Sequence, residues 1–145
     1  MIVLDTTVLV YAVGTDHPYR DPCRTLVAGI DAAGVRATTT VEVIQEFAHI
    51  RSRRRDREDA RRLAEDFTDL LSPLLAVSER DLRAGLERWE RGASLGAFDA
   101  VLAAAARGAG AKALVSSDMG FATVPGVPHV LPDQAGIAAL LDRGT

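Results

Sequence analysis

Short apolar runs alternate along the chain with longer segments whose apolar residues recur every three or four positions. The length and β-branched content of the short runs predict strands at 2–4, 35–40, 74–78, 112–117 and 129–131. The helical spacing of the longer segments predicts helices at 21–34, 41–54, 57–71, 78–92, 95–110 and 133–143. This alternation indicates an α/β fold with a central parallel sheet of four to five strands flanked by helices.

Residues that begin and end helices support this division. Asp21 followed by Pro22 is typical of a helix start, with Asp21 as the N-cap. Ser78 begins a capping pattern in a segment that ends at Gly92, and Asp133 is the expected cap of the last helix. The predicted strands and helices therefore have defined ends.

Composition narrows the class of protein. The chain has 145 residues, 48% of them hydrophobic, which predicts one domain over residues 1–145. It has no apolar run near 18 residues and no basic leader with a cleavage site, so we expect a cytoplasmic protein that is neither membrane-spanning nor secreted. The only cysteine, Cys23, cannot form an internal disulfide. A net charge of −3 excludes bulk attraction to nucleic acid, so any contact with nucleic acid would be local.

Two aspartates directly follow predicted strands. Asp5 follows the run at 2–4, and Asp118 follows the strand at 112–117. Each taken alone is typical of a cap or turn residue, Asp5 as the cap of the segment 6–12. In a parallel sheet, both carboxylates would emerge at the edge where such sheets bind their ligands.

Two further acids lie on predicted helices close to apolar positions. Glu46 lies at the border of the apolar stripe of its helix, with Glu42 one turn earlier on the same side. Asp99 is the only polar side chain from 96 to 106. It is therefore either the N-cap of a helix that starts at Ala100 or a carboxylate that faces a pocket.

These four acids would repel one another if they met. Two unit charges about 4 Å apart cost roughly 1 kcal/mol in water and several times more when partly buried. Without a cation such a cluster holds protons, and oxygen ligands without cysteine or histidine favour the hard cations Mg²⁺ or Mn²⁺. Because Mg²⁺ also accepts water and phosphate oxygens as ligands, the cluster indicates phosphodiester chemistry.

Four stretches of the chain together resemble a PIN domain. They are IVLDTTVLVYA at 2–12, TTTVEVIQEFAHIRSRR at 38–54, LGAFDAVLAAAARGAGAKALVSSDMGF at 95–121 and HVLP at 129–132. The resemblance is to the short VapC-type ribonuclease toxins of the VapBC toxin–antitoxin systems, and it covers essentially the whole chain. It implies an endoribonuclease in which metal-activated water attacks an RNA phosphodiester.

The resemblance also implies roles for individual residues. The acidic, catalytic quartet corresponds to Asp5, Glu46, Asp99 and Asp118, and the Mg²⁺ or Mn²⁺ ligands correspond to Asp5, Asp99 and Asp118. Thr7 and Ser116 fall where the family has hydroxyl residues that support the site. Many members carry a further acid where this chain has Gly120, so a second metal position is weaker here. Glu42 stays an alternative to Glu46.

The basic run at 51–62 is a candidate for phosphate contact beside the acids. The possible RNA contacts are Arg51, Arg53, Arg54 and Arg55. The alternative is a solvated turn whose arginines pair with the acids at 56, 58 and 59. The resemblance adds an RNA substrate, a cognate VapB-type antitoxin and a homodimer or larger toxin–antitoxin assembly as partners.

Two other functions remain open. One is a non-catalytic PIN-like domain with a weakened metal site, which would bind RNA or act as a scaffold. The other is a phosphoryl-accepting aspartate domain, which also has acids at its strand ends. Position 7 is threonine rather than aspartate and Lys112 precedes its strand, which disfavours this second alternative.

Overall fold

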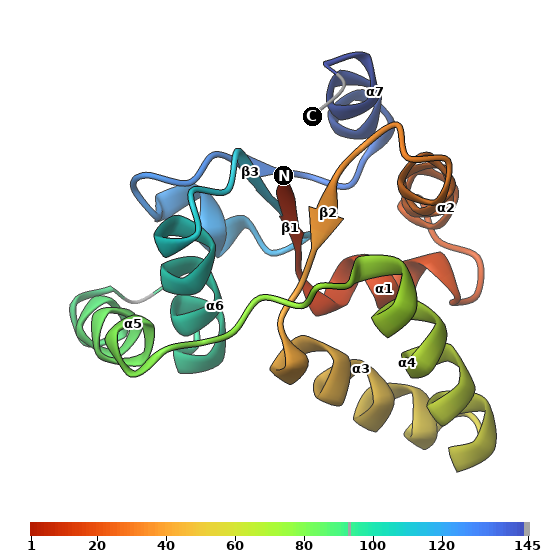
Figure 1. Ribbon diagram of the computed structural model, residues 1–145, viewed down its shortest axis with the longest axis horizontal. Coiled ribbons are helices and arrows are strands. Elements are labelled where there is room, and N and C mark those ends of the chain that lie inside the picture. Colours follow the sequence, from red (N-terminus) through yellow and green to blue (C-terminus); the bar gives the residue numbers. More distant parts are fainter. Residues whose placement is uncertain (93, 144–145) are drawn as a thin grey trace.

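Four parallel strands form the centre of the fold in the computed structural model, which describes residues 1–92 and 94–143 (Figure 1). The strands are β1 (Ile2–Leu4), β2 (Ala37–Thr38), β3 (Ala113–Val115) and β4 (His129–Val130), in the spatial order β2-β1-β3-β4. In register, Leu4 lies opposite Val115, so β1 and β3 end side by side. The α/β architecture with a parallel sheet is confirmed, and the sheet of the described residues has four strands. Ala93 and the last two residues of the predicted 1–145 domain lie outside the described residues.

Seven α-helices of the described residues flank this sheet. They are α1 (Thr6–Ala12), α2 (Arg20–Asp31), α3 (Val41–Arg54), α4 (Arg57–Leu71), α5 (Glu79–Arg91), α6 (Ala97–Gly108) and α7 (Gln134–Asp142). In Figure 1, α5 and α6 lie to the left of the strands, whereas α1 to α4 lie to the right and below. The strand ends therefore lie between two helical groups.

The core is built from the strands and the inward faces of the helices. All three residues of β1 are fully buried, as expected for a central strand covered on both sides. Phe47 of α3 and Phe67 of α4 meet edge to face with ring centroids 5.1 Å apart, which joins these two helices. Cys23 is buried in the same core, and burial raises the pKa of its thiol to about 12. This core holds the strand ends in fixed positions.

The predicted strand at 74–78 is wrong. A single parallel bridge, between Thr40 and Leu75, takes its place, and Leu75 donates one backbone hydrogen bond to the Thr39 carbonyl at 2.8 Å. The preceding Pro73 has no backbone N–H to give a ladder. The segment crosses the edge of β2 without extending the sheet.

The starts of the helices agree with the predictions in most cases. Ser78 forms a capping box with Asp81 at the start of α5, and the side chain of Asp133 accepts the Gly136 N–H at the start of α7. Asp21 is not an N-cap, because α2 begins at Arg20 and Asp21 lies in its first turn. A proline in a first turn costs no hydrogen bond, so it does not define the first residue of a helix.

The segment 118–128 contains a short 3₁₀ helix, η1 (Met119–Thr123). Asp118 is its N-cap and accepts a hydrogen bond from the Gly120 N–H. A turn of this kind satisfies backbone groups directly after a strand. The strand β3 therefore passes straight into a structured turn that carries Asp118.

We predict that Gly85→Ala destabilises the protein. A Cβ atom at Gly85 in α5 would lie 2.6 Å from the Cα atom of Val101 in α6, so the two helices would have to separate. Overpacking of this kind lowers the free energy of unfolding by about 1 to 3 kcal/mol, against a helix-propensity gain of up to about 1 kcal/mol. Urea denaturation measures the change.

The control for this prediction is Gly92→Ala, because a Cβ there would make only an ordinary contact of 3.4 Å with the Arg88 carbonyl. Equal urea midpoints for Gly85→Ala and Gly92→Ala would show that the packing of α5 against α6 tolerates a side chain at position 85, which would contradict the prediction.

Candidate acidic active site

Asp5 lies at the end of β1 with only 3% of its surface exposed. Its backbone N–H donates to the Val115 carbonyl at 3.0 Å, which continues the pairing of β1 with β3. Its side-chain oxygen Oδ2 accepts hydrogen bonds from the Thr7 hydroxyl at 2.9 Å and the Ser116 hydroxyl at 2.7 Å. A buried carboxylate is stable only when it is hydrogen-bonded or paired, and these two hydroxyls supply the bonds.

Asp5 occupies the N-cap position of α1, but its side chain makes no capping hydrogen bond. The interpretation of Asp5 as a side-chain cap is therefore wrong. The carboxylate is turned toward β3, where the Ser116 hydroxyl donates to it. The predicted supporting residues Thr7 and Ser116 both contact this carboxylate directly.

Asp118 is joined to Asp5 through the same hydroxyls. The Ser116 hydroxyl accepts the Asp118 backbone N–H at 3.0 Å, and the Thr7 hydroxyl accepts the Ser117 N–H at 3.1 Å. The side chain of Asp118 is exposed, and its Oδ1 accepts the Gly120 N–H at 2.8 Å. Asp118 therefore acts as a cap, and it also lies at the strand-end edge where Asp5 is buried.

Glu46 reaches the site from α3. Its carboxylate accepts a hydrogen bond from the Thr6 hydroxyl in the first turn of α1, and its side chain is half-buried. Glu42 is exposed and lies against a different cavity, beside Leu82 and Phe98. The geometry therefore brings Glu46, and not Glu42, to the strand ends.

Thr6 is a contributor that the sequence alone did not suggest. It is 3% exposed and donates to Glu46, while its neighbour Thr7 donates to Asp5. The sequence signal that could have identified Thr6 is a pair of consecutive hydroxyl residues directly after a strand-end acid, at the first turn of a helix. Successive residues of a helix point about 100° apart, so each hydroxyl serves a different carboxylate.

Asp99 is the third residue of α6, whose N-cap is Gly96. The alternative interpretation, in which Asp99 caps a helix that starts at Ala100, is therefore wrong. Burial raises the pKa of Asp99 to about 7, with further contributions from the negative charges of Asp5, Asp118 and Glu46 in that order. All four predicted acids thus share one electrostatic environment.

The four acids share this environment without a common centre. Within residues 1–92 and 94–143, no three acidic, histidine or cysteine side chains converge closely enough to hold a metal ion as they stand. Asp5, Glu46 and Asp118 instead turn one oxygen each toward a neighbouring donor. The donor set of oxygens alone and the mutual repulsion at Asp99 still fit a hard divalent cation, because such a cation would stabilise the ionised carboxylates.

The packing of the fold requires glycine at position 120. A Cβ atom there would lie 2.3 Å from the Ser94 carbonyl oxygen and 2.8 Å from a methyl carbon of Leu95. An acidic side chain at this position would force η1 away from the segment before α6. This packing excludes an acidic side chain at position 120.

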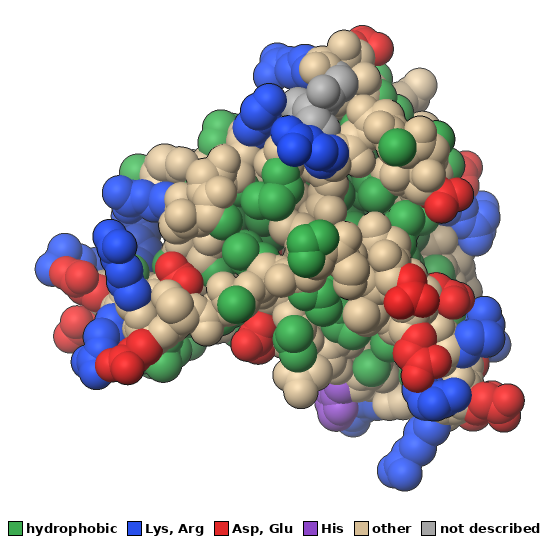
Figure 2. Space-filling model, in the orientation of Figure 1, with side chains coloured by type: hydrophobic (Ala, Val, Ile, Leu, Met, Phe, Trp, Pro, Cys, Tyr) green, Lys and Arg blue, Asp and Glu red, His purple; other side chains and the backbone are tan. Residues whose placement is uncertain are grey.

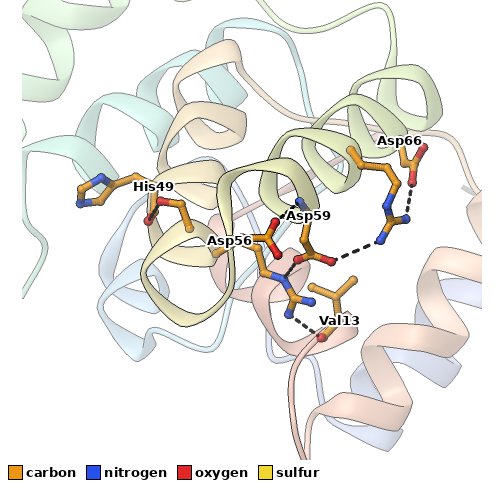
Figure 3. Close-up of polar contacts among 8 residues, drawn as sticks. Val13, His49, Asp56, Asp59 and Asp66 are labelled. Carbon is orange, nitrogen blue, oxygen red and sulfur yellow. Dashed lines mark hydrogen bonds and ion pairs between the residues drawn. The ribbon is translucent and has the colours of Figure 1, made fainter.

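The side chain of Arg51 is bound by other residues of the protein and is not bonded to Asp5, Glu46, Asp99 or Asp118. Its guanidinium donates to the Val13 carbonyl at 3.0 Å and to Asp59 Oδ2 at 2.5 Å (Figure 3). The hydrogen bond from Arg51 is the largest cause that lowers the pKa of Asp59. Arg51 thus ties the end of α1 to α3 and α4.

The other arginines of the run behave differently. Arg53, Arg54 and Arg55 are exposed, and within the described ranges they form no ion pair. The expected pairing with the acids at 56, 58 and 59 is limited to Asp59, which binds Arg51 and Arg62. Their RNA contacts stay a prediction.

Comparisons with known proteins agree with this arrangement. The model of the PIN domain family matches residues 2–127. The chain is 55% identical to Ribonuclease VapC7 of Mycobacterium tuberculosis over 142 residues, which cover 97% of this chain and 98% of the relative. It is 27% identical over 130 residues to VapC ribonuclease Mb1869c of Mycobacterium bovis and to Ribonuclease VapC13 of M. tuberculosis, covering 90% of this chain and 99% of each relative. The chain, with its strand-end acids, therefore belongs to the PIN-domain family, among the VapC-type ribonuclease toxins.

Proposed function

We propose that this chain is a Mg²⁺- or Mn²⁺-dependent endoribonuclease that acts as the toxin of a type II toxin–antitoxin system. The observation that supports this most is the shared environment of Asp5, Glu46, Asp99 and Asp118, in which burial and, after it, three negative neighbours raise the pKa of Asp99. The printed name of the relative with 55% identity, Ribonuclease VapC7, supports RNA as the substrate.

The proposed mechanism assigns a task to each acid. Asp5, Asp99 and Asp118 hold the cation, and Glu46 orients the attacking water or accepts its proton. When bound, the divalent cation lowers the pKa of a water molecule and stabilises negative charge on the phosphate oxygens. Asp5 and Glu46 are held in place before substrate arrives by the hydroxyls that donate to them.

The proposed partners follow from the family. The VapC names of the relatives support a VapB-type antitoxin as the cognate partner of this chain, within a homodimer or a larger assembly. Within the described residues no helix has the length and apolar character that crossing a bilayer requires. We place the protein in the cytoplasm, where both its RNA substrate and its antitoxin would be available.

We predict that RNA cleavage depends on Glu46 and not on Glu42. Glu46→Gln should lower the rate of cleavage in Mg²⁺ by at least about a hundredfold, because a positioned acid or base contributes on the order of 10² to 10⁴ in rate. Glu42→Gln removes the same charge from an exposed position of the same helix and should leave the rate unchanged. The rates are measured on total RNA, with an EDTA sample as the blank.

If Glu42→Gln lowered the rate of RNA cleavage and Glu46→Gln did not, Glu42 would be the glutamate of the active site. Stabilisation of the protein by Mg²⁺ without cleavage of any RNA would instead identify the chain as a non-catalytic PIN-like domain. Gly120, where the fold leaves no room for a further acid, is the feature that favours this second function.

We predict that Asp99→Asn stabilises the metal-free protein at pH 8. The pKa of Asp99 is about 7 in the folded protein and about 3.9 in the unfolded chain, so its contribution to stability is complete below about pH 4 and is lost as the pH rises through 7. Asparagine stays neutral and avoids this loss. The expected gain in Tm is roughly 4 °C for each kcal/mol recovered, reduced by solvent screening at this partly exposed position.

Calorimetry at pH 5 and pH 8 in EDTA tests this, with Asp69→Asn on the exposed face of α4 as the control. The Tm difference between Asp99→Asn and the parent should be larger at pH 8 than at pH 5, whereas the control should show no such dependence. The same Tm difference at both pH values would mean that neither burial nor the other three acids raise the pKa of Asp99.

A further inference from the structure

The helices α1 and α3 pack against each other beside the acids, where the Thr6 hydroxyl donates to Glu46. On α3, Ile50 and Arg54 follow Glu46 at steps of four residues, so they continue one ridge of the helix. On α1, Val10 follows Thr6 in the same way. Both ridges lead from the acids toward the far ends of the two helices.

A cavity of about 500 Å³ lies at the far ends of the two helices. Its lining is partly apolar and partly polar, and its rim carries the exposed Thr15 and the two arginines Arg54 and Arg55. The apolar lining residues are Val10, Val13, Phe47 and Ile50. With a rise of 1.5 Å per residue, Arg54 lies about 12 Å along α3 from Glu46.

The charge of the cavity rim is not compensated. Arg54 and Arg55 are exposed, and neither has an ion-pair partner among the described residues. On the face shown in Figure 2, by contrast, acidic and basic side chains mix over α4 and α5, where Arg61 pairs with Glu65 and Arg83 with Glu79. The third arginine that lines the cavity, Arg51, is already held by Asp59.

We propose that this cavity binds the RNA strand on one side of the phosphate that is cleaved. Arg54 and Arg55 contact a backbone phosphate, and the apolar wall formed by Val10 and Ile50 receives an unstacked base. The inference rests on the proposed function and extends it, because it names a subsite that would fix the position of the RNA relative to the acids.

The combination of groups favours RNA over a segment of another protein. An RNA strand places a phosphate and a base at each nucleotide, which matches arginines above an apolar wall. The cavity and the acidic site also lie along the same two helices, which Thr6 and Glu46 join, so one strand that follows α3 can reach both. An acidic, apolar peptide has related chemistry and is distinguished by the experiment.

The experiment compares two double variants that each remove two positive charges. Arg54→Gln with Arg55→Gln changes the cavity rim, whereas Arg36→Gln with Arg80→Gln changes two exposed arginines that do not line the cavity. Binding of a fluorescent, mixed-sequence RNA of about a dozen nucleotides is measured by anisotropy in EDTA, so that the RNA stays intact. Cleavage of unlabelled RNA in Mg²⁺ is measured separately.

The rim variant should bind this RNA at least about fivefold more weakly than the control variant. The loss of this phosphate contact should lower the slope of log K against log salt by about 0.7, the value for one phosphate of a single strand. A third variant, Thr15→Phe, fills the cavity without a change in charge. It should weaken binding while the salt slope stays the same, and it keeps the test valid if the arginine variants fold poorly.

Each remaining outcome overturns the inference. Equal RNA binding by the rim and control variants would show that the arginines act only through bulk charge. Loss of binding to a fluorescent octaglutamate–leucine peptide, with RNA binding intact, would identify the cavity as a peptide site. If the parent protein cleaves RNA and all variants bind RNA equally well, only the proposed subsite is wrong. If the parent protein neither binds nor cleaves RNA, the proposed function is wrong as well.

Discussion

The buried carboxylate of Asp5 is the constraint on which the rest of the site depends. It is 3% exposed, and its Oδ2 atom is held by hydroxyls from two segments more than a hundred residues apart in sequence. Those hydroxyls come together only because β1 pairs with β3 in a register that puts Leu4 opposite Val115. A shift of this register would remove the Ser116 hydroxyl and leave the buried carboxylate with the Thr7 hydroxyl alone, and an incompletely bonded buried carboxylate costs several kcal/mol. The sheet and the site therefore specify one another.

The acids around Asp5 impose a cost on the fold that the core must offset. Asp5, Asp118 and Glu46 each contribute to the raised pKa of Asp99, so ionisation of the fourth acid is unfavourable in the metal-free protein. A rigid, fully buried β1 and the aromatic contact of Phe47 with Phe67 supply apolar contacts close by. Stability given up at such a site is typical of groups arranged for chemistry rather than for folding.

Much of this arrangement could be predicted from the sequence. The alternation of strands and helices, the capping residues Ser78 and Asp133, and the strand-end positions of Asp5 and Asp118 all follow from local patterns. The strand expected at 74–78 could not be excluded locally, because its single bridge depends on where the edge of β2 ends. Local reasoning favoured Glu46 over Glu42, because Glu46 lies nearer the apolar stripe, but it could not show that this face of α3 meets Thr6 of α1.

The contact of Thr6 with Glu46 and the need for glycine at position 120 could not be predicted from the sequence, for a different reason. Both depend on contacts between segments far apart in the chain: Thr6 with Glu46, and Gly120 with the carbonyl of Ser94. Such contacts carry no periodic signal, since a hydroxyl or a missing side chain is chosen by one neighbour rather than by a pattern.

Gly120 also limits the charge of the site. A further carboxylate at this position would stand two residues from Asp118 and would add its repulsion to that of the three acids that already raise the pKa of Asp99. The close approach of η1 to Ser94 excludes that side chain on steric grounds before its charge matters. The same contact that packs η1 against the segment before α6 thus keeps the acidic site at four carboxylates, a number that one divalent cation neutralises only in part. Arg54 lies about 12 Å from Glu46 along α3, with Arg55 next to it. At this distance the two arginines do not neutralise the acids, and their positive charge can attract the phosphates of a substrate.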